Sequence, residues 1–560
     1  MGAMTAAHPG RARPRAGSWR GAVATLTAVA ALVVLLLAGA SSARAAEPPA
    51  APRDYAQPTT FDALNLSWKG GAGNSGSSGD GLVWGGSYFL QAYLLMFEAT
   101  GDRRYLSTFV AQADRILAGR DSERGRRDWR ARSLPAWSVG DPYTVGAVAL
   151  ADATGVPVLE LSSALPAAGK ARVAVGAGTA PGTFRLTVWN PSRVYRRQPT
   201  DVLDDLTMDP ASPDYAPARI AAAFPDSKLQ LTARDLRAPG LAGGDPAPGQ
   251  RRLTALRYVF PVHTGQLTYP LARFARIVRT TPGLRDDPGY AATADRYVEA
   301  ARAAVAVHDE DWRETPSGEG FYVTPKGAPV RYDGVELPFN QVLSLGRTMI
   351  ELAVLTGDER YADRVRKIAR WFKADLRLNA AGAYEWSYAW TRGRFFTGWT
   401  AEDGVSRYLP SHPGTRVAED VEHGHIDVGF AVLAFEELGT ASGFTDADMR
   451  AFAATFVRKI ITTDARGVPT VFDRVDGSGA KGRRANIPAA WLPLSDWDRA
   501  ISDHLYADFN RRQPAATTPE VVLGAAYLAK HARRGRGGTP VAPRGHTSGG
   551  AGGAASSLSR

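Results

Sequence analysis

The stretch LPFNQVLSLGRTMIELAVLTGDERYADRVRKIARWF, residues 337–372, carries the pattern that decides the fold. Apolar residues recur at helical spacing on both sides of a short polar turn, TGDERY (356–361). In such a turn the glycine ends the first helix, the aspartate caps the second, and the tyrosine packs back between them. The stretch therefore predicts a helical hairpin.

A second copy of this unit lies near the start of the chain. The stretch LVWGGSYFLQAYLLMFEATGDRRYLSTFVAQADRIL (82–117) contains the turn TGDRRY at 100–105, again between two apolar helical patterns. Looser copies occupy 263–305 and 425–460, and a last helix is predicted at 519–533. The copies follow one another at irregular distances, which argues against a regular solenoid. The pattern indicates separate hairpins, arranged in a ring and joined by long loops.

Residues 145–257 interrupt the helical pattern. Short, alternating, β-branched segments bounded by Gly and Pro predict strands in this region. These segments are VPVLEL (156–161), ARVAVGA (171–177), TFRLTVWN (183–190) and KLQLTAR (228–234). The sequence therefore predicts a small β-rich domain, inserted between a first helical part at 61–144 and the remainder at 258–533.

The two ends of the chain differ from its middle. Residues 1–45 combine arginines, an apolar run and the triplet Ala43-Arg44-Ala45, which together are typical of a secretory signal peptide. We therefore expect a secreted or extracellular protein; because the apolar run is long, an uncleaved membrane anchor is the alternative. A Pro/Ala-rich linker follows at 46–60, and the Gly/Ser-rich tail at 534–560 is predicted to be disordered.

The charge of the chain argues against one class of protein, and its lack of cysteine excludes two kinds of site. Residues 1–45 and residues 531–560 each hold five arginines and no acid, so the formal net charge of +11 falls to +1 for the part between them. Total charge therefore gives no support for a nucleic-acid binder, which needs a basic surface on its folded part. The chain has no cysteine, which excludes disulfides and thiolate metal ligands.

Helical hairpins rich in Trp and Tyr, joined by TGD-x-RY turns in an exported chain, resemble the six-hairpin (α/α)-toroid superfamily of carbohydrate-active enzymes. The resemblance covers residues 82–144 and 258–530 and implies a mainly-α toroid. Glycoside hydrolases, unsaturated-glycuronyl hydrolases, polysaccharide lyases and uronyl epimerases share that scaffold, so the implied partner is a polysaccharide or oligosaccharide. The β-rich insertion departs from the plain toroid, and no subfamily's catalytic residues are carried over by position.

The stretch EDVEHGHIDVGF (419–430) gathers acids and histidines at a predicted helix start. His423 and Asp427 are four residues apart and share one helix face, with His425 turned away. Three interpretations stay open: a divalent metal site of His423, His425 and Asp427, a catalytic or substrate-binding histidine, and a structural hydrogen-bond network. We expect no metal and no other cofactor, and His423 is the better catalytic candidate of the two histidines.

The segment YEWSYAWTRGRFFTGW (384–399) is poorly patterned for a buried strand or helix but suits the wall of a sugar-binding cleft. Aromatic faces stack on sugar rings, and charged side chains hydrogen-bond to hydroxyl or carboxylate groups. The substrate-binding candidates are Glu385, Trp386, Trp390 and Trp399. Ordinary aromatic core is the alternative.

Polar residues also recur at other predicted helix entrances and loops. They occur in PVHTGQ (261–266), SGEGFYV (317–323) and ELPFNQ (336–341). A single polar residue at a helix start usually caps that helix. When several helix starts are arranged around a ring, however, their polar side chains come together at one open end of the ring. The further substrate-binding candidates are therefore His263, Gln341, Glu319 and Tyr322.

Two reactions compete for these residues. A lyase or C5-epimerase acting on a uronic acid needs groups that neutralise the carboxylate, a base that removes the C5 proton and an acid. The candidates for the three roles are, in turn, Asn340, Gln341 and Arg407; His423 or His425; and Tyr388 or Tyr408.

A glycoside hydrolase needs instead two carboxylates that flank the glycosidic bond. Glu319, Glu385, Asp420 and Asp427 could supply them, although no pair is singled out by spacing. A non-catalytic glycan-binding cell-surface protein is a third hypothesis. The sequence favours the lyase or epimerase reaction on a uronic-acid-containing glycan, because histidine, tyrosine and amide residues cluster at the predicted mouth.

Overall fold

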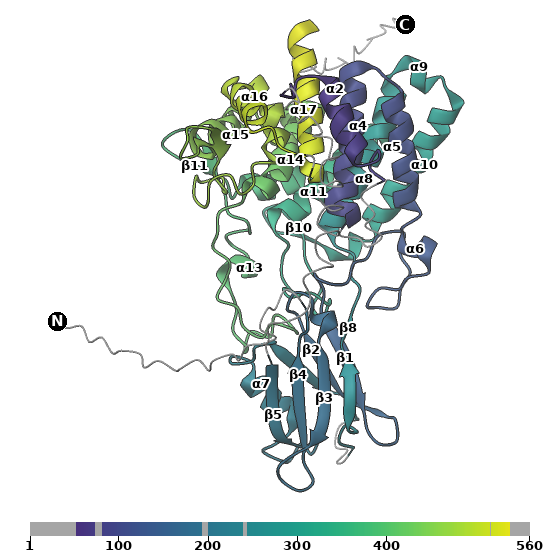
Figure 1. Ribbon diagram of the computed structural model, residues 1–560, viewed down its shortest axis with the longest axis vertical. Coiled ribbons are helices and arrows are strands. Elements are labelled where there is room, and N and C mark those ends of the chain that lie inside the picture. The colour runs from purple at the N-terminus through teal and green to yellow at the C-terminus, as the bar shows by residue number, and fades with distance from the viewer. Residues whose placement is uncertain (1–51, 73–80, 193–199, 239–243, 516, 538–560) are drawn as a thin grey trace, which may run out of the picture. The chain divides into compact units, whose positions relative to one another are not determined.

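The computed structural model describes residues 52–72, 81–192, 200–238, 244–515 and 517–537 (Figure 1). The predicted signal peptide at 1–45, the first part of the linker and all but the start of the tail lie outside the described residues. Within the described ranges, no helix is both long and apolar enough to cross a membrane.

Long helices form an inner ring. Its first four members, in order around the ring, are α4, α8, α11 and α14. The short helix η6 packs between α14 and α17, and α17 packs against α4 and closes the ring. Other elements cover both flanks of each inner helix, and most residues of α4, α8, α11, α14 and η6 are buried. The inner helices are α4 (Ser87–Thr100), α8 (Pro261–Thr280), α11 (Phe339–Thr356), α14 (Val421–Leu438), η6 (Pro488–Asp496) and α17 (Pro519–Gly537).

A second helix backs each member of the inner ring and lies on its outside. Those that follow the TGD-x-RY turns have their apolar residues on one face, which packs inward. The outer helices are α5 (Arg104–Leu117), α10 (Pro288–Ala306), α12 (Glu359–Lys373), α15 (Asp446–Thr455), α16 (Ala500–Arg512) and, against α17, α2 (Pro58–Ser67). The predicted class, a mainly-α toroid of helical hairpins with an inserted β-rich domain, is confirmed.

The TGD-x-RY turns work as their residues predict. Gly357 ends α11 with φ 67°, a left-handed conformation that favours glycine, and the carboxylate of Asp358 accepts the backbone N–H of Arg360 at 3.0 Å. Tyr361 packs back into the hairpin and is buried. Gly101 repeats the same ending for α4 with φ 72°.

The fifth position of the ring departs from the repeat. Its inner member η6 is a 3₁₀ helix whose sequence, PAAWLPLSD, contains Pro493 inside the helix. Proline has no N–H to donate and its ring clashes with the preceding turn, so a long α-helix cannot form there. This is why no hairpin pattern marks the fifth position in the sequence.

The backbones of α8 and α11 approach each other closely. A Cβ atom on Gly265 would lie 2.4 Å from the backbone of Ser344 and Leu345, so only glycine fits. One turn further, the hydroxyl groups of Thr268 and Thr348 hydrogen-bond at 2.9 Å. Small residues and paired hydroxyls therefore set the spacing of these helices, and with it the spacing of the side chains at their N-terminal ends.

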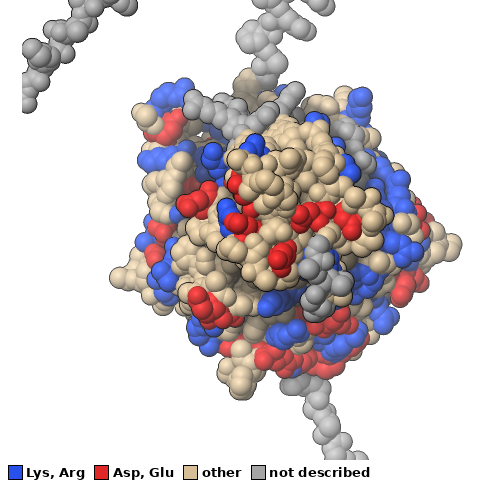
Figure 2. All heavy atoms as spheres, turned by 90° about the horizontal axis from the view of Figure 1, so that it is seen from below, with Lys and Arg blue, Asp and Glu red and all other residues tan. Residues whose placement is uncertain are grey.

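The inserted domain is a sandwich of two four-stranded antiparallel sheets, with strand orders β6-β2-β1-β8 and β5-β4-β3-β7. It has an apolar core of its own, formed by the inward-facing residues of both sheets. Its strands are β1 (Gly146–Ala151), β2 (Pro157–Ser163), β3 (Arg172–Ala177), β4 (Phe184–Trp189), β5 (Thr200–Leu206), β6 (Leu231–Asp235), β7 (Gly249–Arg252) and β8 (Thr254–Ala255). Figure 2, which views the molecule from below, shows basic and acidic side chains interspersed on that face.

Candidate acid–base site

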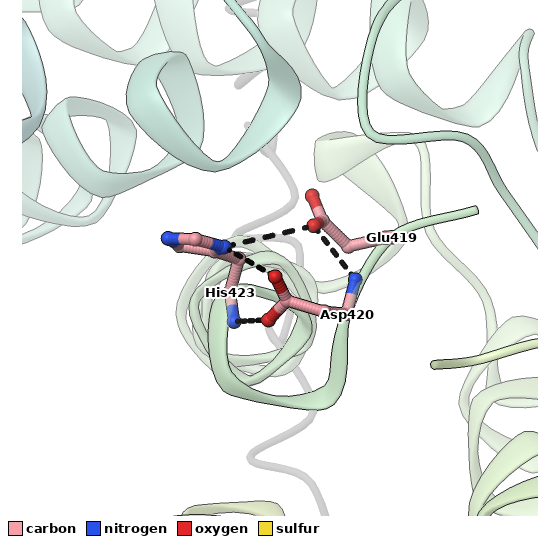
Figure 3. A group of neighbouring side chains, drawn as sticks. All are labelled: Glu419, Asp420 and His423. Atoms are coloured by element: carbon pink, nitrogen blue, oxygen red, sulfur yellow. Dashed lines mark hydrogen bonds and ion pairs between the residues drawn. The ribbon is translucent and has the colours of Figure 1, made fainter. Parts of the chain in front are cut away.

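A cluster of polar side chains surrounds the start of α14. Asp420 is the N-cap of this helix, and its carboxylate accepts the backbone N–H of His423 at 2.9 Å. Glu419, Asp420 and His423 face one another across this first turn (Figure 3). The acids of EDVEHGH therefore begin the helix and at the same time surround one imidazole ring.

The imidazole of His423 is paired with Asp420. Its Nδ1–H donates to Oδ2 of Asp420 at 2.8 Å, and the nearer oxygen of Glu419 lies 4.0 Å from the same nitrogen. Figure 3 shows the other side of the ring pointing away from both acids. With Nδ1 holding the proton, Nε2 carries the lone pair of the neutral ring, and the side chain is 30% exposed.

The pair sets the protonation of both partners. Burial disfavours the charged ring, but the hydrogen bond and the charge of Asp420 outweigh it and raise the pKa of His423 above its ordinary value. Burial likewise opposes the ionisation of Asp420, yet the bond from His423 holds the pKa of Asp420 below its usual range. The pair thus favours the ionised carboxylate of Asp420 and the protonated ring of His423.

Glu419 lies beneath this pair and is fully buried. Its carboxyl accepts the backbone N–H of Asp420 at 2.9 Å and the amide of Asn340 at 3.4 Å. Burial, with the charges of Asp427 and Asp420 nearby, raises the pKa of Glu419 well above its ordinary value. Burial also raises the pKa of Asp427 to about 7, although Trp386 donates its indole N–H to that carboxyl at 2.9 Å. Two buried acids that face each other in this way share a proton.

Arg484 fixes the acids from the far side of the helix start. Its guanidinium donates to Asp473 at 2.9 Å, contacts Asp420 at 3.2 Å and pairs with Glu422. The loop of Arg484 lies more than sixty positions from His423 in the chain, and no motif marks it. Only the fold could bring it to the site.

Tyr388 lies on the other side of His423, with 5.9 Å between the ring centres. Burial raises the pKa of its hydroxyl, which is therefore neutral and able to donate. The amides of Asn340 and Gln341, at the start of α11, lie close to this hydroxyl and oppose the rise of its pKa. The structure thus gathers His423, Tyr388 and the two amides, as the sequence predicts; their roles stay predictions.

Trp84 also lies beside His423, although nothing in the sequence marks it. It belongs to η1 (Leu82–Gly86), a turn of π-helix directly before α4, and is partly buried. Its ring lies edge-on to two imidazoles, 6.1 Å from His263 on α8 and 6.3 Å from His423 on α14. Burial lowers the pKa of His263 to about 3, so that ring is neutral. Trp84 reads in the sequence as one more apolar residue of the first hairpin.

The predicted sugar platforms need correction. Trp386 is fully buried and packs against Phe372 and Phe452, and Trp399 is 4% exposed, with its indole N–H donating to a backbone carbonyl. Trp390 is partly buried against Phe321. These rings are core, because the long loops between hairpins pack over the ring and need apolar residues of their own.

Other candidates have structural partners away from His423. Glu319 pairs with Arg392, Glu385 with Lys459, and Arg407 with Glu160 of the β-rich domain. Tyr322 is buried, as is Tyr408, and the former contacts Arg364. Of the acids named for a hydrolase, only Asp420 and Asp427 belong to the His423 cluster.

The ring of His425 lies apart from the His423 cluster, near Tyr88 of α4, with 6.3 Å between the ring centres. Its Nδ1–H donates to the backbone carbonyl of Glu422, and burial lowers its pKa to about 3. Among the described residues, one group of three has ligand atoms that all lie within 4.8 Å of one another. It consists of Glu419, Asp420 and His423, a different set from His423, His425 and Asp427. Arg484 already supplies positive charge to Asp420 in this set.

No protein-family model matches this chain, and no curated protein matches it. Among solved structures, the α-1,6-mannanase GH76A of Salegentibacter sp. HEL1_6 matches over 49% of this chain and 76% of its own, with 11% identity and a TM-score of 0.32. An inactive variant of that enzyme in complex with α-1,6-mannotetrose matches over the same shares, with 12% identity and a TM-score of 0.33.

Proposed function

We propose that this protein is a carbohydrate-active enzyme whose acid–base centre is the Asp420–His423 pair at the start of α14. One observation carries the proposal: a partly exposed imidazole is held by an ionised carboxylate through Nδ1 and presents Nε2. The same arrangement makes histidine a general base in many enzymes. A tyrosine hydroxyl, two amides and the partly buried indole of Trp84 surround it, which are the groups that hydrogen-bond and stack on sugars.

The reaction that this arrangement supports best is proton abstraction from a uronic acid residue. Nε2 of His423 would remove the proton at C5, and the electron pair left behind would move into the carboxylate, where the amides of Asn340 and Gln341 would stabilise it. In elimination the C4–O4 bond then breaks and the leaving oxygen takes a proton, with Tyr388 as its donor. In epimerisation the proton returns to C5 from the opposite face instead.

Hydrolysis of a glycosidic bond is the second candidate. It is favoured by the opposed protonation of two adjacent carboxyls, since Glu419 holds a proton and Asp420 does not. Glycosidases use such a pair as acid and as base or nucleophile. The burial of Glu419 places it behind His423, so this candidate requires Glu419 to act through the imidazole or after a rearrangement.

A product assay separates the candidates. The full chain is incubated with uronic-acid-containing and neutral polysaccharides, and the products are followed by absorbance, reducing ends and solvent deuterium. An unsaturated uronate indicates a lyase, C5 deuterium without cleavage an epimerase, and reducing ends alone a hydrolase. Retained binding with no turnover on the whole panel contradicts the enzyme proposal and favours the glycan-binding alternative.

The variant His423→Ala tests the centre itself. We expect kcat/KM to fall by about 10² to 10⁴, the usual contribution of a general base, while the thermal unfolding midpoint stays nearly unchanged because the ring is partly exposed. His531→Ala on α17 is the matched control and should keep full activity. Loss of folding in the first variant, or equal activity in both, contradicts the assignment.

We further propose that the chain is exported through the signal peptide at 1–45. The proposal is supported by the arginine-rich start, the apolar run and the Ala43-Arg44-Ala45 triplet. Expression of the full chain in a secreting host followed by N-terminal sequencing tests it. A mature N-terminus directly after Ala45 is expected; an intact N-terminus in the membrane fraction contradicts cleavage.

A further inference from the structure

The outward face of the sheet β5-β4-β3-β7 has an unusual composition. Alternate residues of its central strands point into the sandwich core, namely Val173, Val175, Leu186 and Val188. The residues between them therefore point outward, because side chains alternate along a strand. Figure 1 shows β5, β4 and β3 side by side.

On this outward face a tryptophan and two arginines lie in one row. Arg172 of β3 is directly opposite Trp189 of β4 on one side and Arg252 of β7 on the other. Neighbouring strands are about 4.8 Å apart, so the row from Trp189 to Arg252 extends about 10 Å. Like charges directly opposite each other destabilise a sheet.

In the part of the chain that the structure describes, the two arginines lack an acidic partner. Among the described residues, neither Arg172 nor Arg252 has a carboxylate within 4.0 Å, and both are exposed; Arg252 donates only to the backbone carbonyl of Gly169, at 3.2 Å. In contrast, Arg185 on the same face pairs with Asp204. The row therefore presents uncompensated positive charge beside an aromatic ring.

The adjacent row adds groups suited to a sugar. This row consists of Val202, Thr187, Ala174 and Gln250, and each residue lies directly opposite the next on the neighbouring strand. Val202 is 60% exposed. The small side chain of Ala174 leaves space next to the arginine pair, while the hydroxyl and the amide on either side can bind to sugar hydroxyls.

We propose that this face, defined by Arg172, Trp189, Arg252, Thr187 and Gln250, is a binding site for an acidic polysaccharide. Trp189 stacks on a sugar ring, and the guanidinium groups pair with its carboxylate or sulfate groups. A glycan is favoured over a nucleic acid because one ring, one hydroxyl and one amide accompany the cations, whereas nucleic-acid surfaces stack successive bases on several aromatics. The site is separate from the His423 centre and does not depend on the reaction proposed for it.

The test uses the full chain and two variants of equal charge. In one, Arg172→Glu and Arg252→Glu reverse the charge of the face. In the other, Arg285→Glu, at the end of α9 (Pro282–Arg285), and Arg499→Glu, at the N-cap of α16, reverse the charge of two exposed arginines outside the face. Binding to polygalacturonate is measured by calorimetry at low salt, with dextran as the neutral probe. We expect Kd for polygalacturonate to rise at least tenfold in the first variant and to change less than twofold in the second, with no measurable binding of dextran.

Three further readouts keep the result specific. Activity on a short oligosaccharide should be unchanged in the face variant, which separates this site from the His423 centre. The conservative variant with Arg172→Gln and Arg252→Gln should also lose binding and should unfold at the wild-type temperature. Equal losses in both charge-reversed variants, no loss in either, or tighter binding of single-stranded DNA than of polygalacturonate would overturn the proposal.

Discussion

His423 and Asp420 combine a structural and a chemical role in a single turn. Asp420 caps α14 with one carboxylate oxygen and holds the imidazole of His423 with the other. A cap of this kind needs a short acceptor such as Asp or Asn, while the polarisation of the ring needs a charge. The two requirements can be separated by substitution.

The variant Asp420→Asn should keep the helix cap and lose the charge. Because Asp420 raises the pKa of His423, its removal lowers that pKa. His423 must be neutral to accept a proton, so the acidic limb of the kcat/KM profile should move to lower pH, and kcat should fall as the base weakens. A pH profile from 4.5 to 9 measures both effects. An unshifted acidic limb would assign that limb to another group.

Asp427 makes stability depend on pH. Its folded pKa is about 7 against 3.8 for the free side chain. Between these values the folded chain keeps a proton that the unfolded chain releases, so the free energy of unfolding falls as pH rises toward 7. Asp427→Asn preserves an acceptor for Trp386 and should reduce this decline, with a gain of about 1 to 3 kcal/mol at pH 8 relative to pH 5.

Urea unfolding of both proteins at the two pH values measures this difference. Asp503→Asn on the exposed side of α16 is the control and should leave the pH dependence as it is in the wild type. An identical decline in wild type and Asp427→Asn would show that the shared proton belongs to Glu419 alone.

At the residue scale the sequence predicted more of the polar site than of its surroundings. His423 and Asn340 could be named because polar residues at helix starts are few and conspicuous, and Tyr388 because it belongs to an aromatic-rich segment. Arg484 and Trp84 could not, since an arginine in a loop and an aromatic in an apolar stretch look ordinary until distant segments meet. The platforms assigned to Trp386 and Trp399 were wrong for the same reason, as an aromatic-rich loop can form core as readily as cleft.

At the scale of elements, the hairpins depend on their turns. The left-handed ending at Gly357 has open space around the position of a Cβ atom, so a side chain there costs only backbone strain. Gly357→Ala should therefore destabilise the protein by about 1 to 2 kcal/mol, the usual cost of this conformation for an L-residue. Gly101→Ala in the first hairpin should cost the same, and the two losses should add because the turns are distant.

Urea denaturation measures both losses. Gly265→Ala provides the contrast, because its Cβ would collide with the backbone of α11 rather than strain its own; its loss should be clearly larger. A neutral effect at Gly357 and Gly101 would mean that the hairpins do not rely on these glycine endings.

Some of the hairpins could be predicted from sequence patterns and others could not. Hairpins with a TGD-x-RY turn were predictable because the turn fixes both helix ends. The fifth hairpin was not, since η6 contains Pro493 and has no long apolar repeat. The pairing of α2 with α17 was also hidden, because the two helices stand at opposite ends of the chain.

At the scale of the whole molecule, ion pairs tie the inner helices together. Glu98 on α4 pairs with Arg273 on α8 and Lys530 on α17, both at 2.6 Å. Arg273 and Arg276 also contact Glu351 on α11, at 3.5 and 3.0 Å. Burial opposes the ionisation of Glu98, but the two cations lower its pKa to about 2. The network therefore links helices from the start, the middle and the end of the chain.

Glu98→Gln should cost about 3 kcal/mol at pH 7, because it leaves two partly buried cations without their shared partner. The folded pKa lies below the ordinary 4.5, so this stabilisation is present above pH 4.5 and is lost as pH falls toward 2. The difference between wild type and variant should shrink over that window. Unfolding free energies from pH 7 to pH 2.5 measure it, and a constant difference would point to lost packing instead of lost charge.

The position of α17 has a consequence for how the ring is completed during synthesis. The helix occupies the space between α4 and α2, and Tyr55 beside α2 donates its hydroxyl to the carbonyl of Pro514 at 2.7 Å. The first hairpin ends at Leu117, and α17 begins at Pro519. At translation rates of about 5 to 20 residues per second, the first hairpin waits roughly 20 to 80 s for its last neighbour. During that interval the flank of α4 that α17 covers in the folded protein stays open, and its apolar residues are available for non-native contacts.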